Sequence, residues 1–374
     1  MYTYFKVRNF RCFQELELDD LALVNLIAGV NDVGKTALLE AIFLHCGAYN
    51  PELTLTLNPF RDIEAEDLEL AKVWTWHRVE YLLHSLFNGF DVSKSIDLVG
   101  EDTVTGHRSL RLRAVGKLLE SAAHQASISV PNESAIGHVE DESEEVPSSE
   151  SAGVLELEVE HEESGRQRKY RMVMDRNGVR TEPLPPAPPF QAFLQDARTR
   201  IPFHRQAILY GNLELHAKQD QVLQVLKVIE PRLKSIRTVA VAGGAILHGD
   251  IGIGRLVPLP VMGEGMVRLA NLVLHIGNAP DGVVLADDID SGLHYSVMFK
   301  VWRGIALAAR QSNTQVFTTT HSWECIKAAH EAFASEEKYN FRLHRLGWLN
   351  GEIKAVTYDQ GTLAASLKHG MEVR

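Results

Sequence analysis

The hydrophobic positions of the first fifty residues follow the pattern of a buried strand that leads into a helix. Residues 21–28 (LALVNLIA) are nearly all apolar, as expected of a strand covered on both faces. In residues 37–47 (ALLEAIFLHCG) the apolar positions repeat at helical spacing, and Gly47 marks the expected end of the helix. Residues 29–36 (GVNDVGKT) lie between them. The pattern predicts the order strand, glycine loop, helix.

The middle of the chain has a mixed pattern. Residues 50–95 are expected to be mainly helical, and residues 96–115 are expected to form strands. Strict alternation over residues 154–160 (VLELEVE) and 168–174 (RKYRMVM) predicts a β-hairpin. Residues 121–152 are rich in Ser, Glu, Ala and Gly, which predicts a flexible acidic segment without a core. The candidate core residues of the helical part are Trp74, Trp76, Tyr81, Leu82, Leu86 and Phe87.

The last third of the chain alternates between helical and strand patterns. A long helix is expected over residues 208–229, followed by strand-like segments at 238–241 and 255–258. Further helices are predicted at 264–276, 294–310 and 322–333, and strands at 282–286, 315–319, 343–349 and 352–358. Strands that alternate with helices in this way predict a parallel sheet. The expected fold class is therefore α/β.

Composition and charge narrow the possible functions. The chain has 374 residues, 45% hydrophobic and 23% charged, which is typical of a soluble globular protein. Its three cysteines, Cys12, Cys46 and Cys325, are too far apart for a disulfide framework or a zinc site. No apolar stretch reaches the ~18 residues of a membrane span, and no signal core is present, so the cytoplasm is the expected compartment.

The formal net charge of −11 argues against a protein that coats nucleic acid through its overall field. A local basic surface remains possible. Several basic residues in the predicted strands could form a face that contacts DNA, or could simply be solvated. They are Arg108, Arg111, Arg113, Arg166, Arg168, Lys169 and Arg171.

The glycine loop fits the phosphate-binding pattern G-x-x-x-x-G-K-[ST] in full. It consists of Gly29, Val30, Asn31, Asp32, Val33, Gly34, Lys35 and Thr36. The glycines allow backbone N–H groups to turn toward phosphates, Lys35 can reach the β- and γ-phosphate oxygens, and the Thr36 hydroxyl can bind Mg²⁺. Both the preceding strand and the following helix are where this chemistry requires them. The loop therefore predicts nucleotide binding.

Two later strand ends supply the polar groups that a phosphate-binding loop needs. Residues 283–288 (VVLADD) predict a buried strand that ends in Asp287, as the carboxylate on the Mg²⁺ side, and Asp288, as the residue that activates water. The strand at residues 316–320 ends next to His321, which is placed to contact a γ-phosphate. The sequence thus predicts a catalytic role for Asp288 and His321.

With these motifs in order, the chain resembles the ABC-type ATPase heads of the OLD, RecF and SMC group. It is most similar to the OLD-like ATPases of bacterial anti-phage systems. The matching segments are NFRCF (9–13), residues 29–42, 258–269, 283–296 and 316–328. The resemblance implies an ABC-type P-loop head with a mixed sheet, formed by residues 1–50 and 200–374. Residues 51–199 would be an inserted region of helices, a β-hairpin and the acidic segment.

The resemblance also implies roles for individual residues. Gly263, Glu264 and Gly265 match the signature loop, which contacts ATP bound to a second protomer, although Met262 stands where transporters usually have Ser. Asp290 matches the loop that communicates across such a dimer. The implied cofactors are ATP and Mg²⁺, with Thr36 and Asp287 toward the metal. The position of the glutamine loop stays open.

The family usually has Glu at the position of Asp288. The shorter side chain would lie roughly 1.5 Å farther from the attacking water if nothing else adjusted. The leading hypothesis is a slow ATPase that dimerises around nucleotide and regulates a separate effector, a nuclease or toxin, in anti-phage defence. A RecF-like DNA-repair ATPase, and a nucleotide-gated switch with negligible turnover, are the alternatives.

A further alternative is a nuclease of the Toprim kind. Asp288 and Asp290 would then form a metal-binding D-x-D motif, with Glu264 as the catalytic acid. This reading leaves Asp287 without a role. Only 53 residues follow His321, which is too few for a separate nuclease domain. Nuclease activity is therefore the least favoured expectation.

Overall fold

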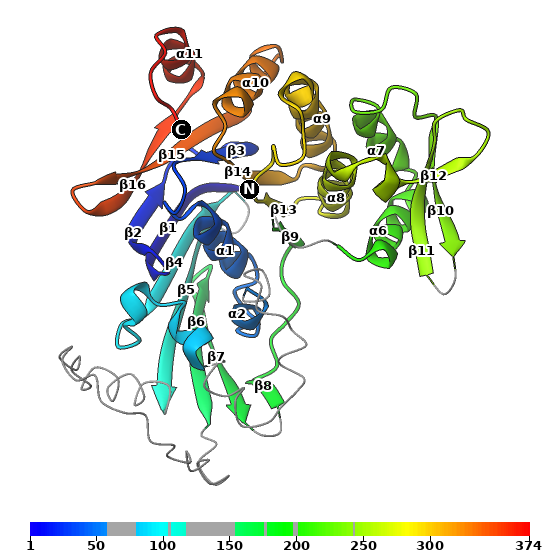
Figure 1. Ribbon diagram of the computed structural model, residues 1–374. Coiled ribbons are helices and arrows are strands. Elements are labelled where there is room, and N and C mark those ends of the chain that lie inside the picture. The colour runs from blue at the N-terminus through cyan, green and yellow to red at the C-terminus, as the bar shows by residue number, and fades with distance from the viewer. Residues whose placement is uncertain (58–79, 104–105, 117–153, 176–177, 197–200, 242–243) are drawn as a thin grey trace, which may run out of the picture.

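The computed structural model describes residues 1–57, 80–103, 106–116, 154–175, 178–196, 201–241 and 244–374. Their strands form three sheets, and helices cover the central one on both faces (Figure 1). Trp74, Trp76 and the acidic segment at residues 121–152 lie outside the described residues.

The central sheet has six strands in the order β16-β15-β3-β14-β13-β9. Their bounds are β3 (Val24–Ala28), β9 (Ala192–Gln195), β13 (Val283–Ala286), β14 (Gln315–Thr320), β15 (Phe341–Leu349) and β16 (Glu352–Tyr358). Only β16 runs antiparallel to its neighbour. The carboxyl ends of the parallel strands meet at one edge, where α/β proteins bind their ligands. The predicted parallel sheet is confirmed.

Apolar residues on the two faces of this sheet belong to two different cores. Ile27, Leu285 and Phe317 face the core that contains α1 (Lys35–Cys46). Leu26 and Val284, which alternate with them, face the core of the helices on the other side. Those helices are α8 (Glu264–Asn278), α9 (Tyr295–Ser312) and α10 (Trp323–Ala334). Burial on both faces explains why β3 and β13 are largely apolar, with sequences VNLIA and VVLA.

The second sheet is antiparallel and has seven strands in the order β2-β1-β4-β5-β6-β7-β8. Their bounds are β1 (Tyr2–Phe10), β2 (Phe13–Leu18), β4 (Ile96–Asp102), β5 (Gly106–Gly116), β6 (Leu155–Glu163), β7 (Arg166–Asp175) and β8 (Gly178–Glu182). The predicted hairpin is confirmed as β6 and β7. The 51–199 segment supplies five strands to this sheet and β9 to the central one, so it shares both sheets with the flanking segments.

A third sheet of three strands packs with two helices at the side of the molecule (Figure 1). The elements are α6 (Phe203–Leu215), α7 (Gln219–Leu226), β10 (Ser235–Val241), β11 (Gly244–Asp250), β12 (Leu256–Pro258) and the 3₁₀ turn η3 (Leu259–Met262). The single helix expected over residues 208–229 is wrong. The chain leaves α6 through Ala217 at φ +55°, and Lys218 N–H donates to Leu213 O, which closes the helix end before α7 begins.

The sequence did not predict β11, because glycines interrupt its apolar run. Gly249 is needed there, since an added Cβ would lie 2.6 Å from Leu233 Cδ1. The short helix α11 (Gln360–Lys368) was also not predicted, although Asp359 and Thr362 form a capping box at its start. Both closing strands, β15 and β16, are confirmed.

The described parts of residues 50–95 hold only short helical segments, including α2 (Leu53–Thr56) and the 3₁₀ turn η2 (Asn88–Phe90). Leu82, Leu86 and Phe87 are buried as predicted. Tyr81 is not a core residue, because its ring packs on Phe90 at the surface and it is 60% exposed.

The basic residues of the described strands do not form a continuous positively charged face. Arg108 is wrong as a candidate, because it is fully buried and donates to the Tyr2 hydroxyl at 2.5 Å. Arg111 and Lys169 do face outward but pair with Asp97 and Glu160. The surface they form therefore carries both signs of charge. Among the described residues, no helix is both long and apolar enough to cross a membrane.

Candidate nucleotide-binding site

The loop at residues 29–34 has the backbone shape that its glycines predict. Gly29 follows β3 at φ +156°, where an added Cβ would lie 2.6 Å from Val33 Cγ1. Gly34 precedes α1 at φ +92°, and an added Cβ would collide with Cys12 Sγ and approach Phe13 Cζ at 2.7 Å. Only glycine fits both positions. Asn31 and Asp32 are exposed on the loop, whereas the Val33 side chain is buried in the core.

Lys35 lies inside this loop. Its Nζ donates to the carbonyl oxygens of Gly29 at 2.8 Å and Val30 at 2.9 Å. Burial lowers the pKa of the Lys35 ammonium group, while the nearby carboxylates, Asp288 first among them, act in the opposite direction. The side chain thus places a positive charge beside the backbone N–H groups at the start of α1, an arrangement that suits phosphate.

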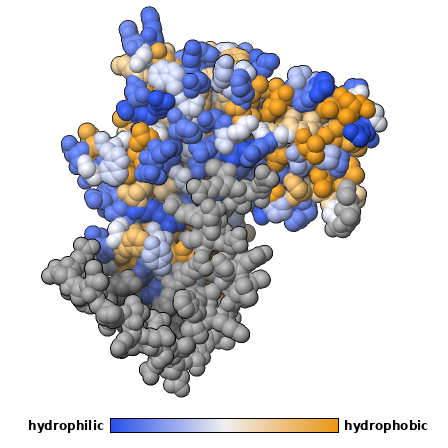
Figure 2. All heavy atoms as spheres, viewed as in Figure 1, coloured by the Kyte–Doolittle hydropathy of each residue, from blue (hydrophilic) through white to orange (hydrophobic). Residues whose placement is uncertain are grey.

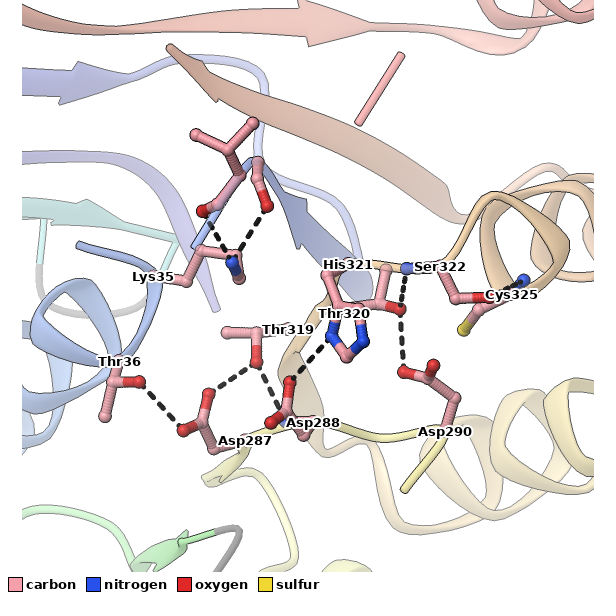
Figure 3. Close-up of polar contacts among 12 residues, drawn as sticks. Lys35, Thr36, Asp287, Asp288, Asp290, Thr319, Thr320, His321, Ser322 and Cys325 are labelled. Atoms are coloured by element: carbon pink, nitrogen blue, oxygen red, sulfur yellow. Dashed lines mark hydrogen bonds and ion pairs between the residues drawn. The ribbon is translucent and has the colours of Figure 1, made fainter. Parts of the chain in front are cut away.

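Asp287 joins the loop to the end of the neighbouring strands. It accepts a hydrogen bond from Thr36 Oγ1 at 2.8 Å on one carboxylate oxygen and one from Thr319 Oγ1 at 2.5 Å on the other (Figure 3). Burial raises the pKa of the Asp287 carboxyl group, and the bonds from Thr319 and Thr36 oppose that rise. The structure therefore brings together the two residues that the sequence assigned to the metal, Thr36 and Asp287.

Asp288 and His321 face each other beside this pair. His321 Nδ1 lies 3.6 Å from Asp288 Oδ1, and both side chains reach solvent (Figure 3). Asp288 has φ +46°, an uncommon conformation for a residue other than glycine. Its backbone N–H donates to Thr319 Oγ1 at 2.8 Å. The carboxylate of Asp288 thus lies beside the His321 imidazole, whereas that of Asp287 is held by Thr36 and Thr319.

Asp290 is held by the strand that precedes His321. Thr320 Oγ1 donates to Asp290 Oδ1 at 2.7 Å and accepts the Ser322 N–H at 3.0 Å (Figure 3). Asp288 and Asp290 therefore have separate partners. Among the described residues, no group of three or more His, Cys, Asp or Glu side chains is arranged to hold a metal ion. This geometry gives no support to a D-x-D metal site.

The predicted signature residues lie at the start of α8. Gly263 has φ +111° and ψ +156°, a conformation that strongly favours glycine, and Glu264 is exposed. Gly265 is buried, and it packs so closely on the neighbouring loop that an added Cβ would lie 2.5 Å from Gly292 O. The signature segment is therefore packed against the loop that follows Asp290, within one protomer.

Three residues of the site were not identified from the sequence. Arg268 of α8 donates through Nη2 to the carbonyl oxygens of Asp287 and Asp288, each at 3.0 Å. Gln195 ends β9, beside Asp287, and its Oε1 is buried without a hydrogen-bond partner. Thr319 bridges Asp287 and Asp288. Gln195 could have been found, since the apolar segment at residues 192–194 (AFL) ends directly before it.

The donor set at Thr36 and Asp287 fits a small divalent cation. A hydroxyl and a carboxylate are hard oxygen ligands, which Mg²⁺ prefers, and nucleotide phosphates complete its coordination in sites of this kind. The phosphate loop follows β3, His321 follows the neighbouring strand β14, and the acids follow β13 on its other side; this order defines a P-loop ATPase head of the ABC type, with mixed sheets as the sequence predicted.

Comparison with known proteins gives the family. A model described as "AAA domain, putative AbiEii toxin, Type IV TA system" matches residues 108–324, more than half of the chain. The chain belongs to this family and is an AAA-type ATPase. A second model, "AAA ATPase domain", matches residues 1–74. The chain is 21% identical over 347 residues to an "ATP/GTP phosphatase" of Helicobacter pylori, with 86% of this chain and 85% of that protein covered.

Solved structures with a similar fold include heads of SMC proteins. One is an SMC head bound to the C-terminal winged-helix domain of ScpA, with a TM-score of 0.48 and 10% identity over 98% of this chain and 99% of that one. Another is the SMC head domain of Thermotoga maritima, with a TM-score of 0.39 and 12% identity over 96% and 99% of the two chains.

Proposed function

We propose that the chain binds ATP with Mg²⁺ and hydrolyses it slowly. The observation that carries this proposal is the hydrogen bond between Thr36 and Asp287 beside the phosphate loop, because it joins the two oxygen ligands that a Mg²⁺–nucleotide site requires. Bound Mg²⁺ would neutralise charge on the phosphates. Lys35 and the backbone N–H groups of the loop would hold the β- and γ-phosphates.

Asp288 is the proposed residue that positions and deprotonates the attacking water. Its side chain is 36% exposed to solvent, and His321 next to it would contact the γ-phosphate. Gln195 is the proposed counterpart of the glutamine loop, because it stands at the end of the strand beside the acid strand with a free amide oxygen. Since Asp288 is one methylene shorter than Glu, we propose a low turnover number.

Self-association around ATP is the second part of the proposal. Val261, two residues before Gly263, is 73% exposed, and a Cβ at Gly263 would meet no atom within 4 Å. A surface with an exposed aliphatic residue and open backbone next to a helix N-terminus suits contact with a nucleotide held by a second copy. Asp290 would lie near the same contact, because Gly292, two residues after it, packs against Gly265.

The biological role we propose is regulation of a separate effector, as in the OLD-like anti-phage ATPases that the sequence resembles. The side lobe of α6, α7 and β10–β12 carries apolar side chains on its surface (Figure 2), among them Phe203, Ile208, Leu215 and Ile253. Such a surface suits a protein partner. The description of the matching family model, a putative toxin of a type IV toxin–antitoxin system, supports a role together with a second protein.

Steady-state phosphate release by the purified chain, with and without Mg²⁺, tests the enzymatic part. Slow release that requires Mg²⁺ and disappears in Lys35→Ala supports it. A nucleotide-gated switch is the second candidate, favoured by the short side chain of Asp288. Tight ATP binding without any phosphate release would establish the switch and exclude the ATPase.

A further inference from the structure

The three threonines that end β14 are all buried but have different partners. Thr319 Oγ1 donates to Asp287 at 2.5 Å and accepts the backbone N–H of Asp288 at 2.8 Å. Its own carbonyl accepts the N–H of Ile289 at 3.0 Å. The neighbouring Thr318 Oγ1 is equally buried and has no hydrogen-bond partner. One hydroxyl of the strand is therefore used to hold both acids.

The two hydrogen bonds of Thr319 hold different parts of the two acids: the side chain of Asp287 and the backbone of Asp288. The bond to Asp287 occupies Oδ1, so that Oδ2 points to Thr36 and the phosphate loop. The bond from the Asp288 N–H holds a backbone with φ +46°, which an aspartate adopts at a cost in conformational energy. Without the hydroxyl, Asp287 could rotate and the Asp288 backbone could relax.

We propose that Thr319 is a positioning residue that orients Asp287 toward Mg²⁺ and Asp288 toward water at the same time. The inference rests on the proposed function and deepens it, because it predicts which side chain sets the Mg²⁺ requirement. Outer partners of this kind typically change metal affinity or activity by about 10- to 100-fold when they are removed.

Valine has nearly the shape of threonine but lacks the hydroxyl, so Thr319→Val removes the hydrogen bonds to Asp287 Oδ1 and from the Asp288 N–H. Thr319→Ser keeps the hydroxyl. Thr318→Val is the matched control, because it makes the same exchange one residue away at a hydroxyl without a partner. Thermal unfolding of each variant without ligand shows whether the fold is retained.

The experiment is a Mg²⁺ titration of ATP binding, followed by calorimetry or with a fluorescent ATP analogue, together with ATP binding in EDTA. Thr319→Val is expected to need about 10- to 100-fold more Mg²⁺ for half-maximal binding, with ATP affinity in EDTA unchanged. Thr319→Ser and Thr318→Val are expected to match the parent. Turnover should fall in Thr319→Val and be restored in Thr319→Ser.

Three outcomes would overturn the inference. In the first, Thr319→Val has the Mg²⁺ requirement and turnover of the parent. In the second, Thr318→Val loses as much as Thr319→Val. In the third, Thr319→Ser, which keeps the hydroxyl, shows the same loss. If the parent itself bound no ATP in either medium, the proposed function would fail, and the Thr319 inference would fail with it.

Discussion

Thr36 and Asp287 lie 251 positions apart in the chain, and Thr36 Oγ1 donates to Asp287 Oδ2 at 2.8 Å. This hydrogen bond joins the start of α1 to the end of β13, across the carboxyl edge of the central sheet. It marks the place where we expect Mg²⁺ to bind between the hydroxyl and the carboxylate.

Asp287→Ala is expected to remove the metal dependence of nucleotide binding. The carboxylate is buried between two hydroxyl donors, so its loss removes the buried negative charge at the proposed cation position. The affinity for ATP in Mg²⁺ should fall by about 10- to 100-fold, toward the value in EDTA. Calorimetric titrations in the two media measure the effect. An unchanged response to Mg²⁺ would remove Asp287 from the metal site.

Asp288→Asn is expected to keep ATP binding and lose turnover by about 10²- to 10⁴-fold, because the amide cannot take a proton from water. The control is Asp288→Glu, which restores the length of the residue usual in the family and should be at least as fast as the parent. Phosphate release under saturating ATP measures both. Parental turnover in Asp288→Asn would exclude this residue as the group that activates water.

Val261→Glu is expected to weaken ATP-dependent self-association about tenfold or more, since a charge would enter the proposed contact. ATP binding by one protomer should not change.

Gly265 is a poor test site, because its packing against Gly292 links it to the fold of the same protomer. Leu184→Glu is the matched control, at an 88% exposed aliphatic residue of the proline-rich segment at residues 183–189 (PLPPAPP). Light scattering with and without ATP distinguishes the two variants. Equal masses for Val261→Glu and the parent in ATP would contradict the proposed contact.

The buried histidine His344 makes stability depend on pH. Burial lowers the pKa of its imidazole to about 3, and it hydrogen-bonds Thr357 and Asn25 in the neutral form. In the unfolded chain its pKa returns to about 6.5. As pH falls below that value, the unfolded chain binds a proton that the folded protein does not. Stability is therefore lost between about pH 6.5 and pH 3.

At pH 5 this residue should lower the free energy of unfolding by about 2 kcal/mol relative to pH 7. Urea unfolding at the two pH values measures the difference. His344→Gln should reduce the difference, whereas the same exchange at the exposed His369 should not. An equal pH dependence in the parent and in His344→Gln would contradict the assignment.

The sequence predicted the parts of the site that follow from local order along the chain. A glycine loop between a strand and a helix places Lys35 and Thr36, and an apolar strand that ends in acids places Asp287, because the carboxyl ends of parallel strands meet at one edge. Thr319 could not be distinguished from Thr318 and Thr320, since all three are alike in sequence and differ only in tertiary partners. Arg268 was missed because its hydrogen bonds to the Asp287 and Asp288 carbonyl oxygens are tertiary contacts that no spacing in the sequence indicates.

The errors in the fold have local physical causes. The helix expected over residues 208–229 breaks at Ala217, which adopts the left-handed conformation without the glycine that usually marks such an end. The β11 strand contains Gly249, whose position is set by contact with Leu233 and not by strand propensity. The pattern of apolar residues indicates neither the left-handed conformation of Ala217 nor the close contact of Gly249 with Leu233.

The central claim is that the loop containing Lys35 binds ATP for hydrolysis. Calorimetric titration of the parent and Lys35→Ala with Mg²⁺–ATP tests it most directly, with thermal unfolding as the check that the variant is folded. We expect saturable binding by the parent and at least a 100-fold loss in Lys35→Ala, because the ammonium group is the side-chain cation within the phosphate loop. Equal affinity of the two proteins for ATP would contradict the account.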